Sequence, residues 1–340
     1  MSPFTDRAAD SVASLGEAAL LRAIRGWLGD AAPPPPWGMG DDCAVVETGD
    51  ANPLLATTDG VVFGRHFDAS TPPAAVGAKL LKRNLSDVAA MGGQPGPALI
   101  NLFLARNTST AWLEQFYAGF ALSCLHFGTR LVGGDITEAP DDVFAAHLTL
   151  LGNPGRNILK RTGAKIGDAL FVTGDLGGSI LGKHLDFSPR LLEGQWLARH
   201  RGVQSLIDVT DGLAKDLPEL LPPGSDALLD LAALPISPAA HKLAKRTTRF
   251  LAHKYPGANT PLIHALTDGE DYELLFALDA AAVAPSFITL WHKKIATPLT
   301  QIGHIAAAPE NRSGPDRQLR DAATGALLLP PGAHGYEHLR

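Results

Sequence analysis

The sequence predicts an α+β protein that is divided into two domains. The chain has 340 residues, which is long enough for two hydrophobic cores. Both halves contain short segments typical of strands and longer segments with helical periodicity. Between them lies GNPGRNILKRTGAKIGD (152–168), which is rich in Gly, Pro and basic residues and is typical of a linker. We therefore expect an N-terminal domain at residues 1–155 and a C-terminal domain at 156–340.

The N-terminal elements follow from apolar periodicity and from turn residues. Residues 15–29 predict an amphipathic helix that the prolines at 33–36 end. The segments CAVVE (43–47) and PLLATTDGVVF (53–63) predict two neighbouring strands. Later elements are a helix at 73–91 that stops at two glycines, a strand at 97–105, a helix at 109–127, and a pair of strands at 129–137 and 144–152 around an acidic loop.

The C-terminal half predicts a second set of elements. A strand, ALFVTG (169–174), is followed by helices, by the stretch IDVTDGLAKDL (207–217), and by a proline-rich region at 222–238. A further strand, EDYELLFAL, covers 270–278, and the tail at 318–332 predicts a closing hairpin.

Composition excludes several classes of protein. A hydrophobic content of 45% and a charged content of 19% are typical of a soluble globular protein. The net charge of −6, without a Lys/Arg cluster, makes nucleic acid an unexpected partner. The two cysteines are too few for a disulfide framework, which favours a reducing cytoplasm. No apolar run is long enough to cross a membrane, and the acidic N-terminus does not resemble a signal peptide.

Acidic residues recur at the ends of the predicted elements, next to Gly, Ser or Thr or one residue away. For any single one, a turn or a helix cap is the better explanation. As a set they suit Mg²⁺ with a nucleotide, because Mg²⁺ prefers oxygen ligands and is held by a few carboxylates together with substrate phosphates. The set comprises Asp42, Asp59, Asp87, Asp135, Asp208 and Asp211.

Asp87 is the most informative member of the set. It lies near the C-terminal end of its predicted helix, where the helix dipole disfavours an anion. Arg83, four residues earlier, offers an exposed ion pair that would offset this cost. Two interpretations stay open, a solvated pair with Arg83 and a metal-bound Asp87, and we favour the metal.

Other residues carry weaker signals. Gly133 and Gly134 precede Asp135 where a strand is expected to end, so backbone N–H groups there would reach a phosphate, although a tight turn explains them almost as well. His66, in an apolar context, is by itself more typical of a packed core residue than of a ligand. The segment GGSILGKH (177–184) has His184 in place of the hydroxyl of a phosphate-binding loop, so we interpret it as a strand-to-helix turn.

Several of these motifs together resemble thiamine-monophosphate kinases. The motifs occur in that family's order and spacing, and the resemblance runs from about Gly16 to Tyr336. They are GMGDDCAVV, ATTDGVVFGRHF, KLLKRNLSDVAAMGGQP, LVGGDIT, KRTGAKIGDALFVTG, IDVTDGLAKDL and DGEDYELLF. The family is similar in fold to aminoimidazole ribonucleotide synthetase, so the resemblance implies a two-domain α+β fold of that type, N-terminal sheets that pair across a homodimer, and MgATP in a cleft.

The resemblance also implies roles for individual residues. Its magnesium ligands would be Asp42, Thr57, Thr58, Asp59, Asp87, Asp135, Asp208 and Asp211. Contacts to ATP would come from Gly134, Asp135, Arg161 and Thr210, and contacts to thiamine monophosphate from His66, Glu270 and Tyr336. In the DD pair, Asp42 would then be the ligand, while Asp41 orients the loop. The segment Phe63–Gly64–Arg65 departs from the family pattern beside the expected substrate site.

The implied reaction moves the γ-phosphoryl group of ATP to thiamine monophosphate by direct in-line transfer, the last step of thiamine diphosphate synthesis. The acceptor phosphate is already ionised, so no general base is needed and charge neutralisation by several Mg²⁺ ions is the main task. Two alternatives remain: another ATP-using enzyme of the same superfamily, and a non-catalytic nucleotide-binding regulator on the same scaffold. Retention of all six aspartates disfavours the regulator.

Overall fold

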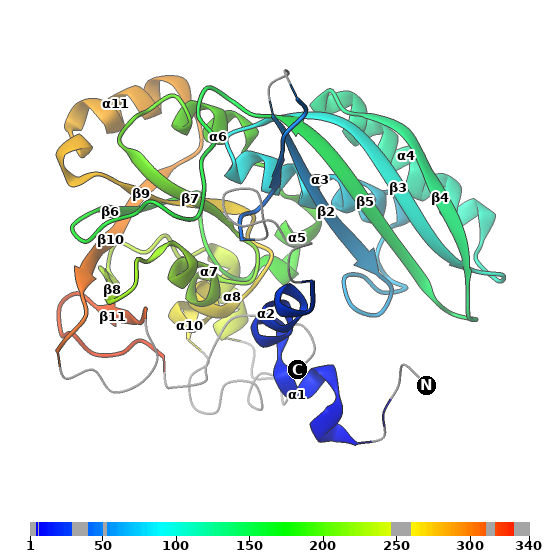
Figure 1. Ribbon diagram of the computed structural model, residues 1–340, viewed down its shortest axis with the longest axis horizontal. Coiled ribbons are helices and arrows are strands. Elements are labelled where there is room, and N and C mark those ends of the chain that lie inside the picture. The colour runs from blue at the N-terminus through cyan, green and yellow to red at the C-terminus, as the bar shows by residue number, and fades with distance from the viewer. Residues whose placement is uncertain are drawn as a thin grey trace.

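The computed structural model describes residues 5, 7–28, 40–49, 53–245, 260–310 and 317–329. Two mixed sheets lie side by side, one in each half of the chain (Figure 1). The N-terminal sheet has the strand order β1-β2-β5-β3-β4, and the C-terminal sheet has the order β11-β8-β10-β6-β9-β7. None of the described helices is long and apolar enough to span a membrane.

The bounds of the elements are as follows. The helices are α1 (Val12–Leu15), α2 (Glu17–Leu28), α3 (Pro73–Ala90), α4 (Thr110–Phe127), α5 (Lys183–Asp186), α6 (Leu191–Leu197), α7 (Leu213–Leu220), α8 (Pro238–Ala244), α10 (Pro261–Thr267) and α11 (Pro285–Lys294). The strands are β1 (Ala44–Val46), β2 (Leu54–Val62), β3 (Gln94–Ala105), β4 (Arg130–Ala139), β5 (Phe144–Asn153), β6 (Ala169–Thr173), β7 (Val203–Val209), β8 (Ser225–Leu229), β9 (Glu273–Leu278), β10 (Leu299–Ala307) and β11 (Leu319–Asp321).

The N-terminal sheet is covered on one face by α3 and α4. Both helices have clear start and stop signals: α3 begins with a proline, and α4 is capped by Ser109, whose side chain accepts from the Trp112 N–H, and ends at a left-handed Gly128. The two helices cross closely, because a Cβ on Gly119 would lie 2.0 Å from the Ala74 carbonyl oxygen. This close crossing fixes α3 over the sheet.

Helix α3 is also the junction between the two halves. It contacts β2 and β5 on one side, and α5, α6 and β7 on the other. Its buried residues belong to a hydrophobic core that continues into the C-terminal sheet through residues such as Phe171 and Phe276. A second core lies on the other face of that sheet, beneath α7 and α10. The position of side chains on α3 therefore depends on packing against both halves.

The predicted elements of the N-terminal half are present, with one error of pairing. The segments at 130–139 and 144–153 are strands, but they do not pair with each other, because β3 lies between them and pairs in parallel with β4 and antiparallel with β5. The two glycines at 133 and 134 lie inside β4 and not at its end. The prolines at 33–36 lie outside the described residues.

In the C-terminal half, the strands at 169–173 and 273–278 are confirmed. The turn of the predicted tail hairpin is present, with an antiparallel bridge between Arg320 and Leu327, whereas residues 330–332 lie outside the described residues. In that turn, the Leu328 N–H donates to the Leu319 carbonyl oxygen. The prediction for the proline-rich region at 222–238 was incomplete, because this region contains strand β8. Strand β10 was not predicted. The segment at 177–184 forms a short 3₁₀ helix and then α5, as a strand-to-helix turn should.

Candidate functional site

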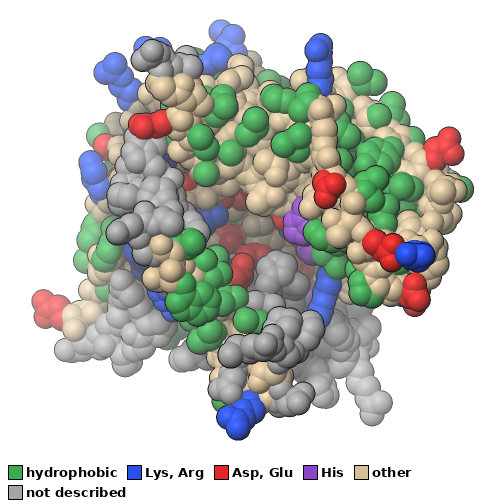
Figure 2. Space-filling view, turned by 45° about the vertical axis from the view of Figure 1, so that its right-hand side comes forward, with side chains coloured by type: hydrophobic (Ala, Val, Ile, Leu, Met, Phe, Trp, Pro, Cys, Tyr) green, Lys and Arg blue, Asp and Glu red, His purple; other side chains and the backbone are tan. Residues whose placement is uncertain are grey.

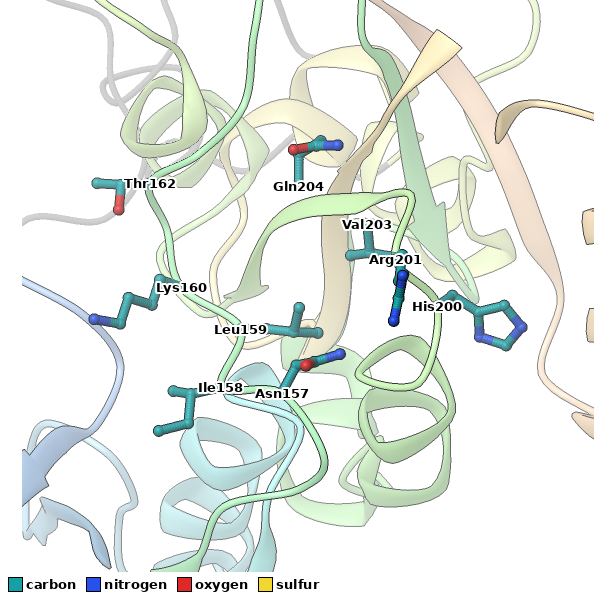
Figure 3. A pocket seen from close by; sticks show the side chains of 9 residues that line it. All are labelled: Asn157, Ile158, Leu159, Lys160, Thr162, His200, Arg201, Val203 and Gln204. Carbon is teal, nitrogen blue, oxygen red and sulfur yellow. The ribbon is translucent and has the colours of Figure 1, made fainter. Parts of the chain in front are cut away.

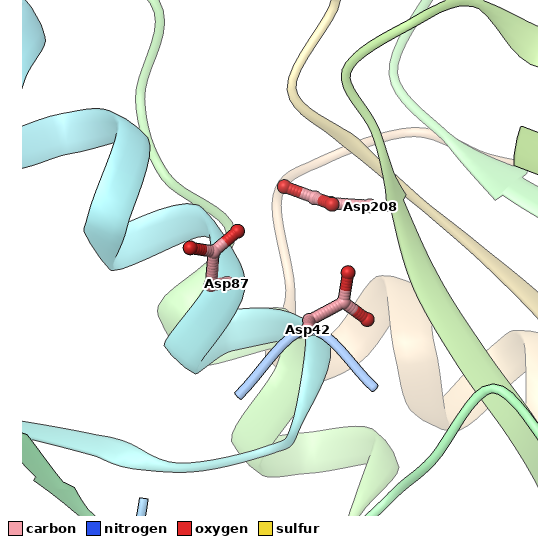
Figure 4. A group of neighbouring side chains, drawn as sticks. All are labelled: Asp42, Asp87 and Asp208. Carbon is pink, nitrogen blue, oxygen red and sulfur yellow. The ribbon is translucent and has the colours of Figure 1, made fainter. Parts of the chain in front are cut away.

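Three aspartates from distant parts of the chain converge at the junction between the halves. Asp42 lies just before β1, Asp87 in the last turn of α3, and Asp208 near the end of β7. Among the described residues, these are the acidic groups that could share a metal ion, because one carboxylate oxygen of each lies within 4.8 Å of the others. Figure 4 shows the three side chains around a common centre.

The electrostatics of this cluster are unfavourable without a cation. Burial raises the pKa of Asp87 well above its ordinary value, and the nearby charge of Asp208 raises it further. Burial and the charge of Asp42 raise the pKa of Asp208 to about 8. At this separation each pair of ionised carboxylates repels by about 3–4 kcal/mol at an effective dielectric constant near 20. A divalent cation would remove that repulsion.

Within the described ranges, each of the three carboxylates is oriented by one hydrogen-bond donor. The Thr57 hydroxyl donates to Asp87 Oδ2 and the Ser86 hydroxyl to Asp208 Oδ2, both at 2.5 Å. Arg161 Nη2 donates to Asp42 Oδ1 at 2.8 Å, whereas Asp42 Oδ2 is buried and accepts no hydrogen bond in the described part of the chain. An acceptor oxygen that is buried without a donor fits a metal ligand.

The loop that carries the DD pair is fixed by both aspartates. Asp41 Oδ1 accepts the backbone N–H of Arg161 at 2.8 Å, while Asp42 accepts from the Arg161 side chain. The sequence predicted that Asp42 faces the metal and that Asp41 orients the loop, and the geometry is compatible with this division. Arg161 thereby joins the N-terminal loop to the segment that follows β5.

The side chain of Asp59 is paired with Arg83. Arg83 Nε donates to Asp59 Oδ2 at 2.7 Å, so the pair of Arg83 with Asp87 that the sequence left open is wrong. Helical spacing allowed that pair, but β2 brings Asp59 closer to the guanidinium group. On the same strand Thr57 is buried and Thr58 is exposed, because successive side chains of a strand face opposite sides.

Asp135 and Gly134 lie apart from the cluster of three aspartates. Both are in β4, whose residues are almost all exposed, and Asp135 is paired with Asn101 of β3. A Cβ at position 134 would lie 1.9 Å from the Ile100 carbonyl oxygen, so this glycine is required by the close approach of the two strands. The assignments of Gly134 and Asp135 to nucleotide and metal stay predictions.

Thr210 and Asp211 form the loop after β7 and are held by Asp216. Asp216 Oδ2 accepts the backbone N–H groups of both residues, at 2.9 and 3.0 Å. The Asp211 side chain is paired with Lys215 at 2.6 Å, and Lys215 also pairs with Glu17 of α2. Sequence reasoning missed Asp216, although its position in the first turn of a helix after a DG turn is the usual signal for such a contact.

Two of the expected substrate residues, His66 and Glu270, both contact the ammonium group of Lys79. Lys79 of α3 is fully buried, forms an ion pair with Glu270 at 2.6 Å and donates to the His66 carbonyl oxygen at 3.2 Å. Burial and the charge of Arg83 lower the pKa of His66 to about 4, so its ring is neutral at pH 7. Tyr336, the third expected residue, lies outside the described residues. Sequence reasoning missed Lys79.

Glu270 is presented by a strained turn. Its φ is +64° and that of Tyr272 is +51°, values that side chains other than glycine rarely adopt. The turn is held because the Glu270 and Tyr272 N–H groups donate to the carbonyl oxygens of Thr210 and Val209. Burial raises the pKa of Glu270, but the charge and hydrogen bond of Lys79 and the charge of Arg83 together outweigh burial, so the pKa ends below its ordinary value. Such strain often marks a functional position.

Two cavities lie near these residues. One, of about 270 Å³, is lined by aromatic side chains that include Phe63, Phe67 and Trp112, and the first two flank the turn that carries His66. The other, of about 310 Å³, lies beside the segment around Arg161 and is lined by basic, polar and apolar side chains without a carboxylate (Figure 3). Figure 2 shows acidic side chains at the bottom of a hollow in the middle of the molecule.

These features define a class of protein: a two-sheet α+β scaffold whose N-terminal half is similar to relatives of AIR synthase. The family model described as "AIR synthase related protein, N-terminal domain" matches residues 40–153. The hydrogenase maturation protein HypE of Escherichia coli has 20% identity and a TM-score of 0.61, with 92% of this chain and 98% of that chain covered. At that identity, the likeness shows the fold alone.

More similar relatives are thiamine-monophosphate kinases. The enzyme of Rhodopirellula baltica is 36% identical, and the match covers 79% of this chain and 83% of the relative. The enzyme of Escherichia coli K12 is 34% identical, with 79% of this chain and 84% of the relative covered. The solved structure of AaThiL complexed with AMPPCP and TMP has a TM-score of 0.74 at 27% identity, with 98% and 99% covered. The chain belongs to the thiamine-monophosphate kinase family.

The raised pKa values predict how bound Mg²⁺ would stabilise the fold at different pH. Without metal, folded Asp208 keeps a proton that the unfolded chain releases near its ordinary pKa of 3.8, so this group costs stability as the pH rises from about 4 to about 8. Protons compete with metal in that range, and the affinity should rise about tenfold per pH unit for each proton displaced. Mg²⁺ should therefore raise the melting temperature more at pH 8 than at pH 6.

Thermal unfolding with and without MgCl₂ at the two pH values measures this effect, with NaCl at matched ionic strength as the control. In the Asp208→Asn variant the difference between the two pH values should become smaller, because one of the competing protons is gone. Equal Mg²⁺ shifts at pH 6 and pH 8 in the unsubstituted protein would contradict the assignment.

Proposed function

We propose that this chain transfers the γ-phosphoryl group of ATP to thiamine monophosphate and releases thiamine diphosphate and ADP. The observation that carries the proposal is the cluster of Asp42, Asp87 and Asp208, which could hold a cation and lies between the two halves. Membership of the kinase family supports it, as does the likeness over 98% of the chain to AaThiL complexed with AMPPCP and TMP.

The three clustered aspartates would hold Mg²⁺. The donors on them suit this role, because each of the three carboxylates keeps an oxygen that its donor does not occupy. When bound, the ions would neutralise the phosphate oxygens of the two substrates, which repel each other strongly. Thr57, Thr58, Asp59, Asp135 and Asp211 would complete the sites for further ions, as the family resemblance implies.

Protein groups would position the two substrates. Arg161 is anchored on Asp42 and would add a fixed positive charge at the ATP phosphates, with Gly134, Asp135 and Thr210 as further contacts. His66 and Glu270 would contact thiamine monophosphate, together with Tyr336. The neutral ring of His66 adds no charge there. No side chain has to remove a proton, because the attacking phosphate oxygen is already ionised at neutral pH.

We also propose that the chain acts as a homodimer in the cytoplasm. Strand β4 is the edge of its sheet and is exposed along almost its whole length, including Val132 and Ile136, which are 63% and 67% exposed. A long exposed edge with apolar side chains favours pairing with another chain. An N-terminal domain at 1–155 would supply this surface, and a C-terminal domain at 156–340 would close the cleft. Both cysteines are buried and unpaired, in agreement with a reducing compartment.

The activity itself is tested by ADP release. With MgATP, thiamine monophosphate should stimulate ADP formation far above the rate with ATP alone, and thiamine diphosphate should appear in equal amount. Other phosphorylated acceptors serve as the control for specificity. ADP formation that does not depend on thiamine monophosphate would leave the regulator or another enzyme of the superfamily as the better assignment.

The metal-holding role of Asp87 is tested by Asp87→Asn. Turnover should fall by at least about 100-fold, because a cation is lost from a phosphoryl-transfer site. The metal-free variant should melt at the same or a higher temperature, since one source of repulsion is gone. Glu114→Gln, an exposed change on α4, is the matched control. Full activity of Asp87→Asn at saturating Mg²⁺ would remove this residue from the mechanism.

The dimer is tested by changing the exposed edge. Ile136→Lys should convert the dimer to a monomer in sedimentation velocity runs, because a charged side chain on an edge strand opposes pairing. Leu192→Lys, at a position on α6 that is 73% exposed, is the control and should leave the mass unchanged. A monomeric unsubstituted protein would contradict the proposal.

A further inference from the structure

Helix α3 carries a line of three charged residues. Lys79, Arg83 and Asp87 are each four residues apart, so they lie one above the other on one side of the helix. Lys79 is paired with Glu270, at the expected substrate end, and Asp87 belongs to the metal cluster. Arg83 therefore lies between the group that would hold the acceptor and the group that would hold the metal.

The guanidinium group of Arg83 is only partly used by the protein. Its Nε donates to Asp59 Oδ2 at 2.7 Å, which fixes the plane of the group. Its Nη1 is buried and has no hydrogen-bond partner among the described residues. A buried N–H group without an acceptor is rare, because it has lost its water without compensation. The Arg83 side chain is 12% exposed, so it is not sealed from the solvent.

Lys79, the other cation of this line, has fewer N–H groups left for a ligand than Arg83. Lys79 has an exposed fraction of zero, is paired with Glu270 and also donates to the His66 carbonyl oxygen. Arginine differs from lysine in presenting several N–H groups in a rigid plane, which matches the oxygens of a phosphate. A phosphate monoester is thus the ligand class that fits the unused side of Arg83.

We propose that Arg83 binds the phosphate of the acceptor substrate, with its Nε kept on Asp59 and its Nη1 donating to a phosphate oxygen. This inference rests on the proposed function and adds a binding residue that the family resemblance did not supply. Asp59 acts as the positioning partner, because it holds the guanidinium group in one orientation. The acceptor phosphate is thereby placed one helical turn from Asp87.

The test separates the phosphate from the rest of the substrate. Calorimetric titrations with thiamine monophosphate and with thiamine, each in the presence of Mg²⁺ and AMPPCP, give the ratio of the two affinities. We expect the intact protein to favour thiamine monophosphate and Arg83→Gln to reduce that ratio about 10- to 100-fold, the value of a hydrogen bond to a charged group. Arg83→Lys, which keeps the charge, should lose less.

The control is Arg106→Gln, since Arg106 also donates through Nε to a carboxylate, at 2.8 Å, but is 79% exposed and is paired with Glu138, which is not part of the cluster. It should leave the ratio unchanged. An unchanged ratio in both Arg83 variants, or an equal loss of affinity for thiamine and thiamine monophosphate, would overturn the inference. If the intact protein forms no thiamine diphosphate, it is the proposed function that fails, whatever the Arg83 variants do.

Discussion

The mutual repulsion of three carboxylates is the constraint on which the rest of the site depends. Asp42, Asp87 and Asp208 come from a loop, a helix and a strand, and the fold forces one oxygen of each to within 4.8 Å of the others. Burying three carboxylates together is costly, because ionised carboxylates are more stable in water. The packing of α3 between both sheets offsets the repulsion between the three carboxylates. A bound cation would reduce this repulsion.

The fold class and most elements could be predicted from local patterns. Helix α3 has a proline start and a double-glycine stop, and the strands of the N-terminal half have short β-branched segments between turn residues. The order of strands could not be predicted in this way. Segments 130–139 and 144–153 are neighbours in sequence, yet β3 lies between them, because a parallel β3–β4 pair needs the crossover helix α4. Strand β8 was hidden by the prolines around it.

Part of the site was readable because its residues lie at the ends of elements. The six aspartates and the order of their motifs predicted a metal site and the kinase family, and three of the six meet in one cluster. The hydrogen-bond partners of these aspartates could not be predicted from the sequence, because they depend on long-range packing. Ser86 donates to Asp208, and Arg83 donates to Asp59 instead of Asp87. Helical spacing offers several partners to Arg83, and only the position of β2 decides among them.

The most direct measurement is the position of a bound divalent ion. Mn²⁺ can replace Mg²⁺ at oxygen sites and is located by its anomalous scattering in a crystal of the full chain grown with Mn²⁺ and AMPPCP. We expect an ion within about 2.5 Å of oxygens from Asp42, Asp87 and Asp208 together. Well-ordered Mn²⁺ bound elsewhere, with these three side chains free of metal, would contradict it.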